Sequence, residues 1–210
     1  NRVVEDFIES EHEMTVDTRA PTSREVKKAE RRAELLAAAA TLFADRGFVG
    51  VRLEDLGAAV GISGPAVYRH FPNKEAVLVE LLVDISEYLL TGGQRVASTE
   101  KMPAEVLGDL IDFHLDFALT SPALIEIQDR DLQSLPAAAH RKVRRMQREY
   151  VEIWVSVLRR LDPTLEESDA RTTAHAAFGL MNSTPFSANR TVSKRSRILL
   201  RAMATGALGI

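Results

Sequence analysis

Cysteine is absent from the 210 residues of this chain, which excludes disulfides and thiolate zinc sites and is compatible with a reducing compartment. Glycine and proline are sparse, with 11 and 8 residues, while leucine and alanine are plentiful, a balance that favours helices over sheets. No apolar run is long enough to cross a bilayer, and the acidic start lacks the basic and then apolar order of a signal peptide. We therefore expect an all-α cytoplasmic protein with no membrane partner.

A large charge of one sign is also missing, because the net charge at pH 7 is −3. Its distribution is more informative than its sum: the net charge is −4 over residues 1–23, +3 over 24–74 and −2 over 75–210. A basic excess confined to one segment is typical of a domain that binds nucleic acid.

Apolar residues recur at helical spacing along most of the chain. We read residues 1–23, which are polar and aperiodic, as a flexible acidic arm, and Thr91-Gly92-Gly93 as the start of a polar linker that ends near Met102. The predicted helices cover about residues 24–46, 53–60, 65–71, 74–90, 103–119, 122–132, 136–161, 166–182 and 194–208.

Local signals support two of these helix boundaries, the end of the first helix and the start of the fourth. Gly47 can take a left-handed conformation past the end of the first helix, and Phe48 can then fold back onto Phe43. Asn73 can cap the fourth helix. The pattern over residues 53–71 is therefore helix, glycine turn at Gly61, helix, which suits a helix-turn-helix but also occurs in ordinary helical bundles.

Three runs make the assignment specific. They are Leu42–Phe48, Leu53–Ser63 and Ala66–Glu75, the last containing Tyr68-Arg69-His70-Phe71 followed by Lys74-Glu75. Together they resemble the amino-terminal domain of the TetR/AcrR family. The resemblance implies a three-helix helix-turn-helix DNA-binding domain over residues 24–73, and a helical ligand-binding and dimerisation domain over 74–210.

Residues expected to contact DNA lie on and around the third helix. In the family, positions matching Tyr68, His70 and Lys74 typically contact phosphates, and the physical chemistry of a phenol, an imidazole and an ammonium at a helix start agrees. Arg52 stands where the family usually has a threonine cap, and it can meet a phosphate instead. Base reading is expected from the leading edge of the helix, namely Ser63, Gly64, Pro65, Ala66 and Arg69, although Arg69 is equally suited to a phosphate.

Other features of this domain leave alternatives open. Gly57 stands where alanine is usual, which lowers helix propensity but permits close helix contact. The basic side chains of the first helix either flank the DNA or form a solvated face; they are Arg24, Lys27, Lys28, Arg31 and Arg32.

The resemblance implies that the last two helices form a dimeric four-helix bundle, so we expect a homodimer on a near-palindromic operator. Compatible apolar faces are present on both helices, although the same stripes would also serve an ordinary core within one chain. The faces consist of Ala174, Ala177, Phe178 and Met181 on one helix and Ile198, Leu199 and Ala202 on the other.

A ligand pocket is predicted from aromatic side chains that share helix faces, although such stripes more often form core. The apolar candidates are Phe113, Phe117, Met146, Tyr150, Trp154 and Phe178. His114, Gln147 and Asn182 are the polar candidates, and His114 alone fits a satisfied core or rim histidine better than a base.

A basic stripe at the start of the long helix extends this hypothesis. It consists of Arg141, Lys142, Arg144, Arg145 and Arg148. These residues form either a solvated face or a rim that binds the phosphates of an acyl-coenzyme A. The solvated face is the leading interpretation of the stripe. The segments 127–131 and 149–155 loosely resemble actinobacterial TetR regulators of lipid and sterol catabolism, a resemblance compatible with the second interpretation.

Rival functions have less support. The sequence has no glycine-rich phosphate loop, no metal-ligand spacing among its histidines and no recognisable catalytic arrangement, so we expect no enzyme, cofactor or metal. A ligand-independent DNA-binding protein would not need the long apolar carboxy-terminal half.

Overall fold

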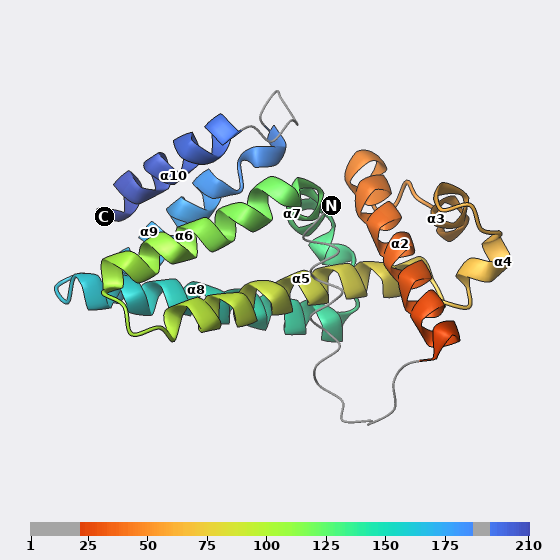
Figure 1. Cartoon of the computed structure of the whole chain (residues 1–210), viewed down its shortest axis with the longest axis horizontal. Helices are drawn as coiled ribbons and strands as arrows, with labels where there is room; N and C mark the ends of the chain where they lie inside the picture. Colours follow the sequence, from red (N-terminus) through yellow and green to blue (C-terminus); the bar gives the residue numbers. More distant parts are fainter. Residues whose placement is uncertain (1–21, 187–193) are drawn as a thin grey trace.

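A computed structural model describes residues 22–186 and 194–210, and within these ranges the chain is helical with no strand. Figure 1 shows an elongated molecule with a small group of helices at one end and a bundle of longer helices that occupies the rest. Most of the predicted acidic arm lies outside the described residues. No helix in the described ranges is long and apolar enough to cross a membrane.

The small group consists of α2 (Ser23–Arg46), α3 (Leu53–Ala59) and α4 (Gly64–Val67). Helix α2 begins with a capping box, in which Thr22 and Glu25 satisfy each other's backbone N–H groups. It ends at Gly47, whose φ is +75°, and Phe48 then packs edge-to-face on Phe43 with ring centroids 5.5 Å apart. The predicted stop signal is confirmed.

The larger bundle is built on two long helices that lie side by side, as Figure 1 shows. These are α5 (Lys74–Ala97), which begins at the small group and is capped by Asn73 as predicted, and α8 (Ala137–Leu161). Around them pack α6 (Pro103–Thr120), α7 (Pro122–Asp131), η2 (Leu132–Ser134), α9 (Glu167–Met181), η3 (Thr184–Phe186) and α10 (Lys194–Leu208).

The linker predicted from Thr91-Gly92-Gly93 is wrong, because α5 continues through these glycines to Ala97. Both glycines are buried and permit close packing. A Cβ on Gly92 would overlap the ring of Phe113, and one on Gly93 would lie 2.5 Å from Cε2 of Tyr150. The glycines therefore allow side chains of α6 and α8 to pack directly against the backbone of α5, which is a packing role and not a break in the helix.

The face predicted for the dimer on the penultimate helix is also wrong in part. Ala174, Ala177 and Met181 are completely buried within one chain, where α9 packs on α8 and α10. On the last helix, by contrast, Ile198 and Leu199 are 62% and 57% exposed. The apolar surface available to a second copy therefore lies on α10 and on the opposite, small-residue side of α9.

Candidate functional site

The helix-turn-helix is a compact unit formed by α3, a glycine turn and α4. Gly61 has φ +71° in the turn. Gly57 lies so close to Val67 that a Cβ there would be 2.6 Å from Cγ2 of the valine. The close contact expected of Gly57 is therefore present, and it fixes the angle between the two short helices.

One face of α4 is open to solvent and carries most of the side chains predicted to contact DNA. Ser63, Pro65 and Arg69 are exposed. Tyr68 is 52% exposed, and its hydroxyl donates to Oε1 of Glu54 at 2.9 Å. The structure thus gathers these residues, with half-buried Gly64, Ala66 and His70 between them and exposed Arg52 at the start of α3.

Lys74 is placed differently from a free phosphate ligand. Its Nζ donates to the carbonyls of Phe48 at 2.8 Å and Val51 at 2.9 Å, and it lies 4.5 Å from the centroid of the Phe48 ring. The ammonium therefore ties the loop between α2 and α3 to the start of α5. The predicted phosphate contact stays a prediction, and it requires this ammonium to be shared or released.

Arg32 of the basic first helix also acts within the chain. Its guanidinium donates to Glu80 of α5 and to the carbonyl of His70, and it lies 4.1 Å from the centroid of Phe71. Burial first, and then the charge of Arg32 and other nearby cations, lower the pKa of His70. The amino-terminal basic residues Arg24, Lys27 and Lys28, in contrast, are exposed.

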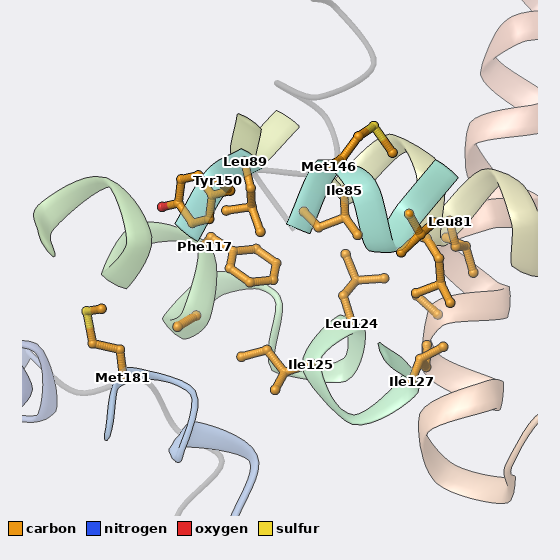
Figure 2. Close-up of a cluster of buried hydrophobic side chains, with 14 of the residues drawn as sticks. Leu81, Ile85, Leu89, Phe117, Leu124, Ile125, Ile127, Met146, Tyr150 and Met181 are labelled. Carbon is orange, nitrogen blue, oxygen red and sulfur yellow. The ribbon is translucent and has the colours of Figure 1, made fainter. Parts of the chain in front are cut away.

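A cavity of about 340 Å³ lies in the larger bundle. Its walls come from five helices, α5 to α9, and from η2. The lining residues are Ser86, Leu89, His114, Phe117, Ile125, Gln128, Asp129, Leu132, Arg144, Met146, Gln147, Tyr150, Val151, His175, Phe178 and Asn182. Figure 2 shows the apolar part of this region, with Phe117, Leu89 and Tyr150 near one another and Ile125 below them on α7.

Most of the predicted pocket residues meet at this cavity. The structure does not bring Phe113 and Trp154 to its wall: Phe113 packs on Tyr88 with ring centroids 5.3 Å apart, and Trp154 is completely buried behind Phe178. The sequence analysis missed the wall formed by α7, including Gln128 and Asp129. These polar residues lie in a short helix, and no periodic pattern marks them.

The deep end of the cavity holds polar groups that are uncharged. His114 lies between Tyr150 and Asn182: its Nδ1 is 3.2 Å from the Tyr150 hydroxyl and its Nε2 is 3.0 Å from Asn182 Oδ1. Burial lowers the pKa of His114 to about 4, against a smaller opposing effect of Asn182, and burial raises the pKa of Tyr150. Both groups are therefore neutral at pH 7, and this end suits an uncharged part of a ligand.

Trp154 adds a further polar atom behind this cluster. Its indole N–H is buried and has no hydrogen bond of normal geometry, although it approaches the Tyr150 hydroxyl closely enough to oppose slightly the rise in the pKa of that phenol. Such an unpaired buried donor costs free energy in the folded chain.

Charged and titratable side chains are found at the mouth of the cavity, where Asp129, Arg144 and His175 are exposed. Partial burial raises the pKa of Asp129. Arg144 also borders a shallow basic groove on α8, whose other charged or titratable residues are His140, Arg141, Lys142, Arg145 and Arg148. The apolar cavity and the basic stripe predicted from the sequence are thus continuous at Arg144.

Between the two groups of helices, α7 contacts the end of α2. The guanidinium of Arg130 donates to the carbonyls of Phe43 and Ala44, the latter at 3.1 Å, and pairs with Asp131 at 3.0 Å. Asp131 is 6% exposed and accepts the backbone N–H of Phe48 at 3.3 Å. This junction was not predicted, because sequence spacing cannot reveal partners more than eighty positions apart.

Comparison with known proteins agrees with this arrangement. Residues 35–81 match the family described as "Bacterial regulatory proteins, tetR family", and residues 100–186 match the "Tetracyclin repressor-like, C-terminal domain". The HTH-type transcriptional repressor KstR2 of Mycolicibacterium smegmatis is 39% identical over 82 residues, which cover 39% of this chain and 40% of that protein. The chain spans 40% to 65% of the length of the first curated relatives it matches.

Two solved structures share the fold. The ketosteroid transcriptional regulator KstR2 of Mycobacterium tuberculosis has a TM-score of 0.75 at 21% identity, covering 85% of this chain and 93% of that one. AibR, solved in complex with isovaleryl coenzyme A and operator DNA, has a TM-score of 0.69 at 18% identity, covering 84% and 96%. In the described residues of this chain, no group of acidic or histidine side chains is arranged to hold a metal ion.

Proposed function

Because this chain belongs to the TetR family of bacterial regulatory proteins, we propose that it is a dimeric, cytoplasmic transcriptional repressor that leaves its operator when a largely apolar ligand enters the cavity. The observation that carries the DNA-binding part is the open face of α4, on which Ser63, Pro65, Tyr68 and Arg69 are exposed together. One such face reads only a few base pairs, so two copies on a near-palindromic site provide the affinity.

The DNA contacts divide by role in this proposal. Tyr68 and His70 bind phosphates, whereas the edge from Ser63 to Ala66 meets bases, and Arg69 serves either purpose. Tyr68 exchanges its bond to Glu54 for a phosphate oxygen when DNA binds. Lys74 is a poor test of phosphate contact, because its loss would also release the loop that it holds.

Substituting Tyr68 and Arg69 tests the DNA contacts. We expect Tyr68→Phe to weaken binding to operator and random duplex alike, and Arg69→Ala to reduce the slope of log affinity against log salt by about one if it binds a phosphate. Fluorescence anisotropy over a salt series measures both. Tyr88→Phe, in α5 and away from this face, is the matched control. A change of sequence preference in Tyr68→Phe would contradict its phosphate assignment.

The ligand class follows from the gradient of polarity along the cavity. The deep end is apolar with neutral hydrogen-bonding groups, and the mouth leads through Arg144 to five further basic or titratable side chains. An acyl group in the cavity with a coenzyme A moiety over the groove satisfies both ends. The isovaleryl coenzyme A bound to AibR supports this class, and it leaves the acyl group of the present ligand open.

Isothermal titration with decanoyl-coenzyme A and with decanoate tests the ligand class. We expect the thioester to bind at least about tenfold more tightly, because charge-assisted hydrogen bonds to phosphate add affinity, and to release operator DNA. Arg145→Met should remove much of this advantage, whereas Arg159→Met at the far end of α8 should not.

Equal binding of both compounds would reassign the basic stripe to a solvated face. Operator binding that responds to neither of them, nor to any other apolar acyl compound, would favour a ligand-independent DNA-binding protein.

A further inference from the structure

Phe48 of the DNA-binding domain is hydrogen-bonded to two helices, α7 and α5, that also line the cavity. Its backbone N–H donates to Asp131 at the end of α7, and its carbonyl accepts from Lys74 at the start of α5. Both helices also line the cavity, α5 with Ser86 and Leu89. The loop after α2 is therefore hydrogen-bonded to both helices: it donates to Asp131 of α7, and its carbonyls, including that of Val51, accept from Lys74 of α5.

The α7 side of this junction is the more elaborate. Arg130 donates to the carbonyls of Phe43 and Ala44 in the last turn of α2, where the helix dipole favours a cation. The Phe43 carbonyl also accepts the backbone N–H of Gly47 at 2.8 Å. Asp131, the partner of Arg130, is buried and accepts from both Arg130 and Phe48. Removing Arg130 would leave the buried carboxylate of Asp131 poorly compensated, whereas the Arg130 side chain is 44% exposed and reaches solvent.

The same short helix presents its preceding residues to the cavity. Gln128 and Asp129 line the wall immediately before the Arg130–Asp131 pair, and Ile125 lines it one turn earlier. Figure 2 shows the two directions of α7: Ile125 lies toward Phe117, whereas Ile127 lies toward α2. A helix of ten residues moves as a unit. A displacement at Gln128 therefore also moves the Arg130 guanidinium, which is bonded to α2, and the Asp131 carboxylate, which is bonded to Phe48.

We propose that Arg130 and Asp131 are positioning residues that transmit occupancy of the cavity to the DNA-binding domain through the end of α2 and Phe48. This inference rests on the proposed function, and it adds a route through α7 to the one that α5 provides by joining the two domains. With the cavity empty, the pair holds α2 and the following loop in place. A ligand that displaces α7 weakens these hydrogen bonds and changes the orientation of the recognition helix α4 toward DNA.

Amide hydrogen exchange in the ligand-free protein tests whether Arg130 and Asp131 stabilise the end of α2 and the following loop. Arg130→Met removes the donors and keeps the apolar stem, and Asp131→Asn keeps the shape and removes the charge. Each should raise amide exchange at Gly47 and Phe48 by about tenfold or more, because both N–H groups are bonded at this junction. Arg159→Met, an exposed arginine paired with Glu167, is the matched control and should leave these amides unchanged.

A double-mutant cycle tests the transmission without requiring knowledge of the natural ligand. Val151→Phe fills the cavity from α8 and acts as a fixed occupant. We expect it to weaken binding to an operator selected from random duplexes by about fivefold or more in the parent chain, a coupling typical of allosteric proteins. In the Arg130→Met background the same substitution should change affinity less than about twofold. Met146→Phe serves as a second filler if Val151→Phe does not fold.

The outcomes separate this inference from the proposed function. An equal loss of DNA affinity in both backgrounds overturns the role of Arg130 while the control of DNA binding by the cavity stands. No loss in either background overturns that control, and the α7 route with it. Unchanged amide exchange at Gly47 and Phe48 in both Arg130→Met and Asp131→Asn also overturns the inference. The end of α2 would then be held in place by the rest of the fold without this pair.

Discussion

At the scale of single residues, His114 shows how burial fixes the chemistry of the cavity. Its pKa of about 4 lies below the ordinary value of 6.5, so the unfolded chain binds a proton that the folded chain excludes. The contribution of this residue to stability is complete above pH 6.5 and declines as the pH falls toward 4. The loss amounts to about 3 kcal/mol across this range.

We expect His114→Gln to flatten the fall in stability between pH 7 and pH 4.5. Urea unfolding followed by circular dichroism at several pH values measures this slope, and His175→Gln, which replaces an exposed histidine at the cavity mouth, is the control. A slope that His114→Gln leaves unchanged would mean that the pKa of this imidazole is the same in the folded and the unfolded chain, and it would contradict the exclusion of the proton by burial.

At the scale of helices, the Gly92-Gly93 pair of α5 determines how closely its neighbours approach. Gly92→Ala should destabilise the protein by about 1–3 kcal/mol, because the added methyl group overlaps the Phe113 ring and overpacks the core. Gly108→Ala is the matched control: it also lies within a helix, and its Cβ would make ordinary contact at 3.7 Å with Arg201. It should stabilise by about 0.5–1 kcal/mol. Thermal unfolding of both variants distinguishes the two effects, and similar shifts would contradict the packing role.

The same glycines show where sequence reasoning reaches its limit. Boundaries that depend on local chemistry, such as Gly47 after α2 and Asn73 before α5, were predicted correctly. A glycine pair, however, is equally typical of a linker and of a tight helix contact, and the difference depends on Phe113 and Tyr150, which are distant in sequence. Periodic aromatic positions predicted much of the cavity, but the α7 wall follows from tertiary packing alone.

At the scale of the whole molecule, the exposed apolar face of α10 is the surface on which we expect the proposed second copy to pack. Ile198, Leu199 and Met203 are exposed on this helix, and α9 presents small residues beside it, including Ala176 and Gly179. Two copies packed through these faces would form a four-helix contact with close backbone approach. Because Ala177 is buried inside the chain, we expect the interface on this surface and not on the face that includes Ala177.

We expect Leu199→Arg to convert the dimer to a monomer at micromolar concentration. Operator binding should also weaken, because each DNA half-site would then bind a separate monomer. Sedimentation velocity measures the first effect and anisotropy the second. Met102→Arg, which places the same charge at another exposed apolar position, should leave both unchanged. A persistent dimer in Leu199→Arg would locate the interface elsewhere.

Trp154 is the single tryptophan of the chain, and it lies completely buried against Phe178, which forms part of the cavity wall. The protein thus carries its own optical reporter one side chain away from the proposed ligand. Its emission should be blue-shifted in the empty protein, because no water reaches the indole. Compounds that enter the cavity should shift or quench that emission while the helical signal stays constant, so a library of unlabelled molecules can be screened for the natural effector with the unmodified chain.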